Sequence, residues 1–216
     1  MISERGWKKH PSDGEIFFNS FGILPYSFTL EKQERISNEL MEGYGSETII
    51  VCEQEPVYTC GIHRDDLSLN LNPLYMITRG GGITFHGPGQ IVSYFLIDLN
   101  RRKMNILDLI EFVHGAEIDY LNIHNVKAES RLGKETGIWV NNKKISSTGF
   151  SIRGGFTMHG IGLNIQTEME KFEAIRPCGF DPSIMTSLQK CTGRTFNMET
   201  EKQRFQKILF EKINGN

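Results

Sequence analysis

The chain has 216 residues, 24 Lys and Arg against 26 Asp and Glu, a net charge of −2 and a pI of about 6.3. This balance argues against a general nucleic-acid binder, which needs a basic face to neutralise phosphates. No apolar run reaches the ~20 residues of a membrane span, and residues 1–9 lack the apolar stretch of a signal peptide. We therefore expect a soluble cytoplasmic protein without nucleic-acid or membrane partners, and an organelle matrix is also compatible with this composition.

The first half of the chain is expected to contain a helix followed by strands. Residues 30–41 have amphipathic spacing and predict a helix with Thr29 as its N-cap. Residues 48–52 form a short run rich in β-branched residues, and residues 91–99 form a longer run of the same kind. Both runs predict strands.

A long helix is expected after the second strand. Asn105 and Asp108 have the spacing of a capping box. The apolar residues of 106–124 then recur at helical intervals. The sequence therefore predicts a helix over 106–124 with Asn105 as its N-cap.

Two hairpins are expected in the second half. Asn141 and Asn142 separate the predicted strands 137–140 and 143–147 and have the composition of a two-residue hairpin turn. A second turn is expected at 153–155, with residues 157–165 as the returning strand.

A last helix closes the predicted pattern. Thr200 and Gln203 have capping-box spacing, and the helix that follows has an apolar stripe made of Phe205, Ile208, Leu209 and Ile213. Helices mixed with hairpins, rather than alternating strictly with strands, indicate an α+β fold. We expect one domain over residues 1–216, with a mixed, largely antiparallel sheet flanked by helices.

Glycine is concentrated in two segments, because ten of the 22 glycines lie within 80–89 and 149–162. In the first segment, Arg79, Thr84 and His86 are interleaved with glycines. Glycine lets the backbone approach a ligand closely and leaves N–H groups accessible. The spacing is neither that of a P-loop nor that of a dinucleotide fingerprint. The pattern favours a ligand-binding loop, with a plain surface turn as the alternative.

Two histidines have matching surroundings. His86 and His159 each follow a bulky apolar residue and precede a glycine. A single histidine in such a place is more often packed and hydrogen-bonded than catalytic. The repetition favours a shared pocket, to which each glycine segment contributes one imidazole.

The four cysteines do not have the spacing of a metal site, and we expect neither metal nor cofactor. Cys178 lies between Pro177 and Gly179, which predicts a tight, non-helical turn. On such a turn the thiol can be accessible, but a buried and inert cysteine is the more frequent finding.

Lys143 and Lys144 follow the Asn-Asn turn on a predicted strand. Because successive side chains on a strand point to opposite faces, one of the two lysines is expected to face the protein interior. A buried ammonium needs a partner or a function. The sequence does not decide which lysine turns inward.

Taken together in order along the chain, these segments resemble the lipoyl(octanoyl) transferases of the biotin/lipoate-ligase-like superfamily. The resemblance extends from about residue 25 to residue 179. It is based on five segments: Arg79-Gly80-Gly81…Thr84-Phe85-His86-Gly87-Pro88-Gly89-Gln90, Gly137-Ile138-Trp139, Lys144-Ile145…Gly149, Met158-His159-Gly160…Leu163-Asn164 and Pro177-Cys178-Gly179. Phe85 stands where tyrosine is common in the family, and Met158 stands where phenylalanine is common.

The resemblance implies an octanoyltransferase that needs no ATP. Octanoyl would pass from an acyl carrier protein to Cys178 as a thioester, and then to a lysine ε-amino group, with Lys144 as the partner of the cysteine. The resemblance also implies an acyl site lined by Arg79, Gly80, Gly81, Gly82, Ile83, Thr84, Phe85, His86, Ser147, Thr148, Gly149, Met158, His159 and Gly160.

The implied partners are two proteins. The donor would be octanoyl-acyl carrier protein, and the acceptor a lipoyl domain of a 2-oxoacid dehydrogenase complex or the glycine cleavage H protein. Because acyl carrier proteins are acidic, the basic run Arg101-Arg102-Lys103 is a candidate docking site for the donor.

Two other functions fit parts of the sequence. One is an ATP-dependent lipoate or biotin ligase, although lipoate ligases typically continue their glycine loop to His-Asp, where this chain has His86-Gly87. The other is a module that binds acyl groups or carrier proteins without catalysis. The presence of both Cys178 and Lys144 argues against it.

Overall fold

The computed structural model describes residues 15–63, 71–176 and 181–215. In chain order the strands are β1 (Phe17–Leu24), β2 (Thr48–Gln54), β3 (Val57–Cys60), β4 (Leu74–Met76), β5 (Ile83–His86), β6 (Gln90–Leu96), β7 (Glu129–Arg131), β8 (Gly137–Val140), β9 (Lys143–Arg153) and β10 (Phe156–Asn164). The α-helices are α1 (Tyr26–Met41), α2 (Ile106–Ile123), α3 (Leu188–Thr192) and α4 (Met198–Asn214). Short 3₁₀ turns are η1 (Gly133–Glu135), η2 (Met169–Phe172) and η4 (Pro182–Ile184).

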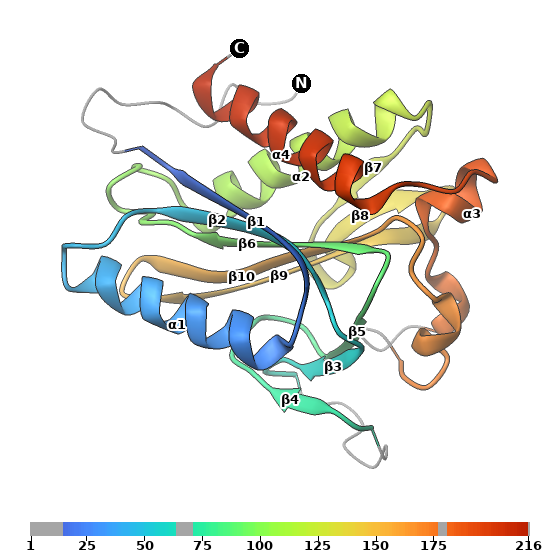
Figure 1. Cartoon of the computed structure of the whole chain (residues 1–216), viewed down its shortest axis with the longest axis horizontal. Helices are drawn as coiled ribbons and strands as arrows, with labels where there is room; N and C mark the ends of the chain where they lie inside the picture. Colours follow the sequence, from blue (N-terminus) through green and yellow to red (C-terminus); the bar gives the residue numbers. More distant parts are fainter. Residues whose placement is uncertain (1–14, 64–70, 177–180, 216) are drawn as a thin grey trace.

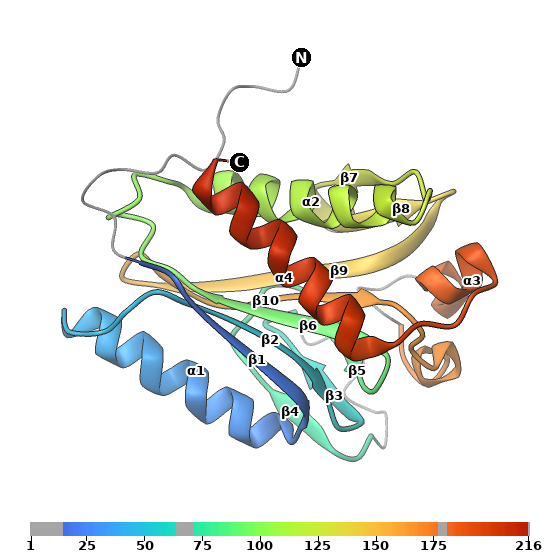
Figure 2. The same ribbon diagram turned by 45° about the horizontal axis from the view of Figure 1, so that its top comes forward.

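The main sheet has seven strands in the order β1-β2-β6-β10-β9-β8-β7. Only the β1–β2 pair is parallel, and the other neighbours are antiparallel. Helices α2 and α4 cover one face of this sheet, while α1 covers the other (Figures 1 and 2). The prediction of a mixed, largely antiparallel sheet flanked by helices is confirmed.

A smaller sheet, in the order β4-β3-β5, lies on the α1 side of the molecule (Figure 1). Strand β5 leads through a short turn into β6, so the small sheet is joined directly to the middle of the large one. One hydrophobic core fills the space between the large sheet and α2 with α4, and a second lies between that sheet and α1. A third cluster packs the small sheet against η2.

Several predicted elements are confirmed in detail. Asn105 accepts hydrogen bonds from the backbone N–H groups of Leu107 and Asp108, and the Asp108 carboxylate accepts from the N–H of Asn105 at 2.8 Å. Asn141 and Asn142 both have positive φ angles, 48° and 61°, as a tight hairpin turn requires. The second hairpin turns at Gly154 and Gly155, between β9 and β10.

The predicted start of α1 is wrong. The helix begins at Tyr26, and Pro25 takes the N-cap position in an extended conformation. Proline fits there because its fixed φ and missing N–H cost little at a helix start. Thr29 lies inside the helix, where its hydroxyl donates to the carbonyl of Tyr26 at 3.0 Å.

The predicted cap of α4 is also wrong. Asn197 caps the helix by accepting a hydrogen bond from the N–H of Thr200 at 3.0 Å, so Thr200 already belongs to the first turn. The amide of Gln203 donates to Glu199 instead of closing a capping box. The predicted apolar stripe is correct, since Phe205, Ile208, Leu209 and Ile213 all join the core.

A buried ion pair joins α4 to β2, and through it to the turn between β5 and β6. The Lys202 ammonium lies 3.5 Å from the Glu53 carboxylate and donates to the carbonyl of Phe21 at 2.8 Å. The other oxygen of Glu53 accepts a hydrogen bond from the backbone N–H of Gly89 at 2.8 Å. Lys202 therefore fixes the glycine turn through Glu53.

The proposed basic docking run is only partly exposed. Arg102 is buried and forms an ion pair with Glu47, with a hydrogen bond from its Nε at 2.9 Å. Glu47 also accepts from the backbone N–H of Asp98 at 3.0 Å. Arg102 is therefore not available to a partner, and the docking hypothesis is reduced to Arg101 and Lys103, which are both exposed.

Candidate active site

The two glycine segments meet in space, as the matching surroundings of His86 and His159 predicted. The first comprises the loop before β5, strand β5 and the turn into β6, and the second comprises the β9–β10 hairpin. The backbone N–H of Gly80 donates to the carbonyl of Phe150 at 2.9 Å. A Cβ atom on Gly149 would lie only 2.9 Å from the carbonyl oxygen of Gly80, so glycine is needed for this close approach.

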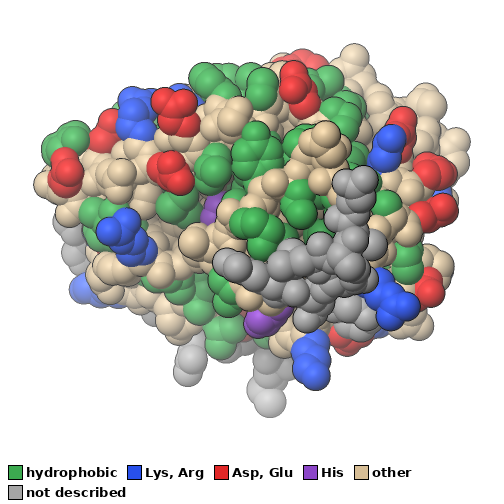
Figure 3. Space-filling model, turned by 90° about the horizontal axis from the view of Figure 1, so that it is seen from below, with side chains coloured by type: hydrophobic (Ala, Val, Ile, Leu, Met, Phe, Trp, Pro, Cys, Tyr) green, Lys and Arg blue, Asp and Glu red, His purple; other side chains and the backbone are tan. Residues whose placement is uncertain are grey.

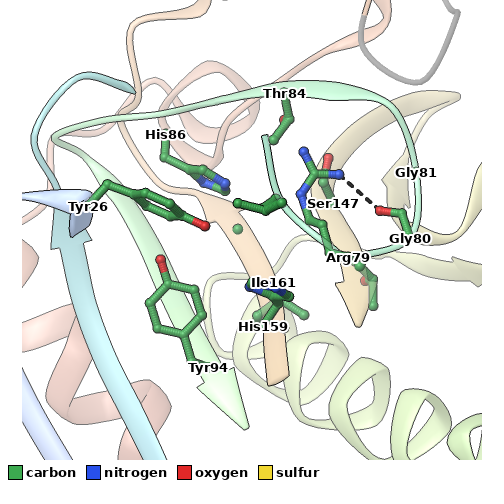
Figure 4. Close-up of a pocket in the computed structure, with 15 residues that line it drawn as sticks. Tyr26, Arg79, Gly80, Gly81, Thr84, His86, Tyr94, Ser147, His159 and Ile161 are labelled. Carbon is green, nitrogen blue, oxygen red and sulfur yellow. Dashed lines mark hydrogen bonds between the residues drawn. The ribbon is translucent and has the colours of Figure 1, made fainter. Parts of the chain in front are cut away.

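A pocket with an empty volume of about 480 Å³, part of it open to solvent, lies between these segments (Figure 4). Ten predicted acyl-site residues line it: Arg79, Gly80, Gly81, Thr84, His86, Ser147, Thr148, Gly149, His159 and Gly160. The predicted shared pocket for the two imidazoles is thus present in the structure.

Four of the predicted acyl-site residues do not line this pocket. On β5, Ile83 and Phe85 point to the opposite face from Thr84 and His86, and they pack in the core of the small sheet. Gly82 is buried, with its carbonyl bonded to the N–H of Gly61. The acyl-site prediction at 83 and 85 did not apply the alternation of side chains along a strand.

Met158, the fourth, lines an adjoining groove. This groove lies between α1 and the β9–β10 hairpin, and it shares Ile77, Gly80 and His159 with the pocket. Figure 3 views the molecule from below, where hydrophobic side chains gather near the middle of this face. The pocket therefore adjoins a groove that is lined in part by apolar side chains.

The sequence analysis missed five lining residues: Tyr26, Ile77, Tyr94, Ile161 and Gly162. Tyr26 and Tyr94 come from α1 and β6, and Figure 4 places both hydroxyls toward the centre of the pocket. Among the described residues the Tyr26 hydroxyl is buried without a hydrogen-bond partner. A tyrosine on a core face was the only available signal, and it is equally typical of ordinary packing.

His86 is held through one ring nitrogen. Its Nδ1 lies 2.6 Å from Oε1 of Gln90, and its ring points into the pocket (Figure 4). Burial lowers the pKa of His86 to about 4, the hydrogen bond to Gln90 opposes this shift, and the charge of Arg79 adds to it. The imidazole is therefore neutral near pH 7.

His159 faces the same pocket from β10 in an unusual backbone conformation. Its φ is 65°, in the left-handed region, and its N–H donates to Oε1 of Gln33 at 3.0 Å. Within the described part of the chain, neither ring nitrogen has a hydrogen-bond partner. Burial, followed by the charge of Arg79 and the neighbouring His86, lowers the pKa of His159 to about 4. Unpartnered buried nitrogens in a pocket are available to a polar group of a ligand.

Arg79 is buried and holds the first glycine segment. Its Nη1 donates to the carbonyl of Gly80 at 2.9 Å. Its Nη2 donates to the carbonyl and the hydroxyl of Thr59, at 2.8 and 2.9 Å. The guanidinium thus fixes the loop on β3 and places a positive charge beside both imidazoles.

Lys144 is the lysine that turns inward. Its side chain is buried, with 3% of the residue exposed, whereas Lys143 is exposed and donates to the carbonyl of Ser183. The Lys144 ammonium lies 5.8 Å from the centre of the Trp139 ring. Lys144 does not line the pocket; it lies at the start of β9, before the pocket residues of that strand.

Helix α2 presents two titratable side chains to Lys144. Glu117 is buried, and burial raises its pKa to about 8 against the opposing effects of Ser146 and the charge of Lys144. Burial also lowers the pKa of His114 to about 4, and the charge of Lys144 adds to that shift. His114 contacts the hydroxyl of Thr148, a pocket residue, at 2.9 Å. The sequence analysis assigned neither side chain a role.

Cys178 lies outside the described residues. Two described residues later in the chain, Met185 and Thr186, are fixed to β9: the N–H of Thr186 donates to the carbonyl of Lys144 at 2.9 Å, and Met185 forms a β-bridge with the same lysine. The backbone of Lys144 is therefore in contact with residues seven and eight positions after Cys178. The roles of Cys178 and Lys144 remain predictions.

The described residues contain no cluster of three or more His, Cys, Asp or Glu side chains arranged to hold a metal ion. The described helices also include none that is long and apolar enough to cross a membrane.

Residues 25–210 match the family model described as "Lipoyl protein ligase A/B catalytic domain", and the chain belongs to this family. Solved structures with the same fold include "Crystal structure of lipoate-protein ligase A bound with ATP", at a TM-score of 0.71, 14% identity and coverage of 94% of this chain and 86% of that one. A biotin protein ligase from Aquifex aeolicus has a TM-score of 0.54 at 15% identity, with coverage of 92% of this chain and 70% of that one. At these identities the likeness concerns the fold alone.

Comparison with curated relatives shows to which group within the family the chain belongs. It is 35% identical to the "Octanoyltransferase" of Syntrophotalea carbinolica, over 87% of this chain and 92% of that protein. It is 42% identical to "Probable octanoyltransferase 2" of Picrophilus torridus over 73% of this chain, a match that spans 63% of that relative's length. Within the family, the chain belongs with the octanoyltransferases. The predicted resemblance is confirmed, and the protein is an enzyme of the acyltransferase class.

Proposed function

We propose that this enzyme transfers octanoyl from octanoyl-acyl carrier protein to a lysine of a lipoyl domain through a thioester on Cys178. The acceptor would be a lipoyl domain of a 2-oxoacid dehydrogenase complex or the glycine cleavage H protein, and the chain would act as one catalytic domain in the cytoplasm. The observation that supports the proposal is the inward position of Lys144, on the strand that also carries the pocket residues 147–149, with its carbonyl bonded to the N–H of Thr186, eight residues after Cys178.

In the first step, the Cys178 thiolate attacks the carbonyl carbon of the donor thioester. A new carbon–sulfur bond forms, the bond to the carrier's thiol breaks, and the leaving thiolate takes up a proton. A free thiol is only a few per cent thiolate near pH 7, and the Lys144 ammonium would favour the ionised form.

In the second step, the neutral amine of the acceptor lysine attacks the acyl-enzyme. The amide bond forms as the bond to the Cys178 sulfur breaks, and the surplus proton of the amine passes to Lys144. Acylation removes the thiolate charge, so the ammonium of Lys144 is less favoured and a neutral amine becomes available as the base. Because the thioester is already activated, neither step needs ATP.

In the proposal, the acyl chain lies in this pocket. Burying about six methylene groups at ~0.8 kcal/mol each would provide roughly 5 kcal/mol for binding and length selection. N–H groups of the glycine segments can stabilise the oxyanion of the tetrahedral intermediate, since no side chain blocks them.

Intact-mass spectrometry after incubation with octanoyl-acyl carrier protein tests the proposal. We expect an octanoyl adduct that Cys178→Ser abolishes and that Cys191→Ser, at an exposed free thiol, leaves unchanged. Lys144→Met should slow both half-reactions and change their pH profiles. An active enzyme without an adduct, or transfer from free octanoate that requires ATP, would contradict the mechanism.

A further inference from the structure

A continuous chain of buried amides connects His86 to the backbone of Lys144. Nδ1 of His86 contacts Oε1 of Gln90 at 2.6 Å, and Nε2 of Gln90 donates to Oδ1 of Asn164 at 2.8 Å. Nδ2 of Asn164 donates to the carbonyl of Thr186 at 3.1 Å, and the N–H of Thr186 donates to the carbonyl of Lys144. We call the two side chains Gln90 and Asn164 the amide relay.

The orientation of each amide follows from its backbone contacts. The carbonyl of Thr186 can only accept, so the atom of Asn164 that faces it must be the NH₂ group. Oδ1 of Asn164 therefore faces Gln90, and the contacting atom of Gln90 must be its own NH₂ group. The carbonyl of Phe85, 3.3 Å from the same nitrogen, requires the same orientation.

These orientations fix the tautomer of His86. The atom of Gln90 left to face Nδ1 is a carbonyl oxygen, so Nδ1 must carry the proton. In a neutral imidazole the other nitrogen, Nε2, then has no proton and can only accept a hydrogen bond. His86 lines the pocket, and its ring points into it (Figure 4).

The surroundings leave the relay little freedom. Gln90 and Asn164 are buried, at 2% and 0% exposure, so a flipped amide would leave buried polar atoms unpaired. A Cβ atom on Gly162 would lie 2.9 Å from Oε1 of Gln90, which means that a glycine makes room for the Gln90 amide. The charged group that acts on His86 is Arg79, and His159 is the titratable neighbour on which His86 acts in turn.

We propose that Gln90 and Asn164 are positioning residues that hold His86 as the Nδ1–H tautomer, so that its bare Nε2 accepts a hydrogen bond from the acceptor amine in the acyl pocket. This inference rests on the proposed function, because it assigns His86 to the second substrate. A thioester carbonyl would need a donor at that place, whereas an amine N–H needs an acceptor. By keeping Nε2 of His86 unprotonated, the relay favours binding of the acceptor amine, which is the nucleophile of the second step.

Nuclear magnetic resonance of ¹⁵N-labelled protein tests the tautomer directly. We expect long-range ¹H–¹⁵N correlations in which Nδ1 of His86 has the shift of a protonated ring nitrogen and Nε2 that of a bare one. His86→Gln assigns the signals. A bare Nδ1 in the wild-type protein would overturn the inference, whatever the enzyme's activity.

Variants of Gln90 test the role of the relay. Gln90→Met keeps the length of the side chain but removes the acceptor, so His86 should shift toward the Nε2–H form. The KM for the lipoyl domain should rise about tenfold, while the rate of Cys178 acylation stays within about twofold. Gln90→Glu keeps an acceptor at Nδ1 and should retain the Nδ1–H form with a raised pKa of His86. It also removes the donor to Asn164 and Phe85, so its stability should fall.

Gln166→Met is the matched control, because the side chain of Gln166 accepts from the N–H of Phe196 and has no contact with His86. It should leave the signals of His86 and both rates unchanged. Retention of the Nδ1–H form in Gln90→Met, or an equal loss of both half-reactions, would contradict the proposal. The adduct assay on the wild-type enzyme tests the thioester mechanism independently, so it shows whether only the role of the relay is wrong or the thioester mechanism as well.

Discussion

Burial shifts the titratable side chains around the pocket toward their neutral forms. His86 and His159 both have a pKa near 4, and the pKa of Tyr26 is raised by burial. Near pH 7 these side chains carry no charge, so the charge that acts on both imidazoles comes from Arg79. A wall of neutral polar groups suits an apolar chain with one polar end, because an ionised wall would hold water in the pocket.

Burial also favours the neutral form of Glu117 on α2, and this makes the stability of the protein depend on pH. Its pKa is about 8 in the folded protein, against 4.5 for the unperturbed group. Between these values the unfolded chain loses the proton while the native protein keeps it, so stability falls as pH rises from about 4.5 to about 8. Below about 4.5 both states are protonated and the penalty is absent.

Glu117→Gln should remove this dependence. Near pH 7.5 we expect the variant to be more stable than the wild type by roughly 4 kcal/mol, and the difference in stability should vanish near pH 4.5. Urea unfolding at several pH values measures it. Glu211→Gln, on the far side of α4, is a control that should leave the slope unchanged. A constant gap at every pH would show that packing, and not ionisation, separates the two proteins.

At the scale of elements, the sequence predicted what local rules control. The capping box of α2 and both tight turns were predicted, because a few neighbouring residues determine them. The start of α1 was not, since the apolar spacing was followed only from residue 30 and Tyr26 is buried one turn earlier. Along β5 the side chains alternate between two faces, so His86 points into the pocket and Phe85 into the core of the small sheet. The sequence alone would have allowed this prediction.

The close approach of the two glycine segments makes a second prediction. Gly149→Ala would place a methyl group 2.9 Å from the carbonyl of Gly80, so the two walls of the pocket must move apart. We expect acylation of Cys178 to slow by about tenfold and stability to fall by roughly 1–3 kcal/mol. Acylation kinetics and urea unfolding measure both effects.

Gly22→Ala serves as the control for that substitution. Gly22 lies in β1, and a Cβ atom there would have no heavy atom within 4 Å. The control should stay within about 0.5 kcal/mol of the wild type. If the two alanine variants behaved alike, close packing between the glycine segments would not be what shapes the pocket.

At the scale of the whole molecule, the sequence was less informative. Strand β2 pairs with β6, and β6 pairs with β10, although these strands are far apart in the chain. Such pairing depends on how two faces of the sheet are covered, and a local pattern does not contain that information. The contribution of Tyr26 and Tyr94 to the pocket was missed for the same reason, because α1 and β6 meet only in the folded protein.

The exposed part of the basic run makes a prediction about the donor. Arg101 and Lys103 lie at the start of α2, with the buried Arg102 between them. Reversing both charges, as Arg101→Glu with Lys103→Glu, should raise the KM for octanoyl-acyl carrier protein by about threefold to tenfold and reduce its dependence on salt. Steady-state kinetics at two ionic strengths measure this.

Lys127→Glu is a matched control, because Lys127 is an exposed cation beyond the other end of α2. It should leave the KM for the carrier protein within about twofold. An unchanged KM in the double variant would remove this surface from the docking hypothesis, and an equal change in the control would indicate a general effect of net charge.

The ion pair between Lys202 and Glu53 sets a lower limit on how far the protein can be shortened. Helix α4 follows all the residues assigned to the acyl pocket, so a fragment without α4 would still contain every one of them. Without it, the Glu53 carboxylate that holds Gly89 would remain inside the protein with no ammonium beside it, at a cost of several kcal/mol. A working fragment therefore has to extend past Lys202, and an affinity tag belongs beyond Gly215 rather than in place of the helix.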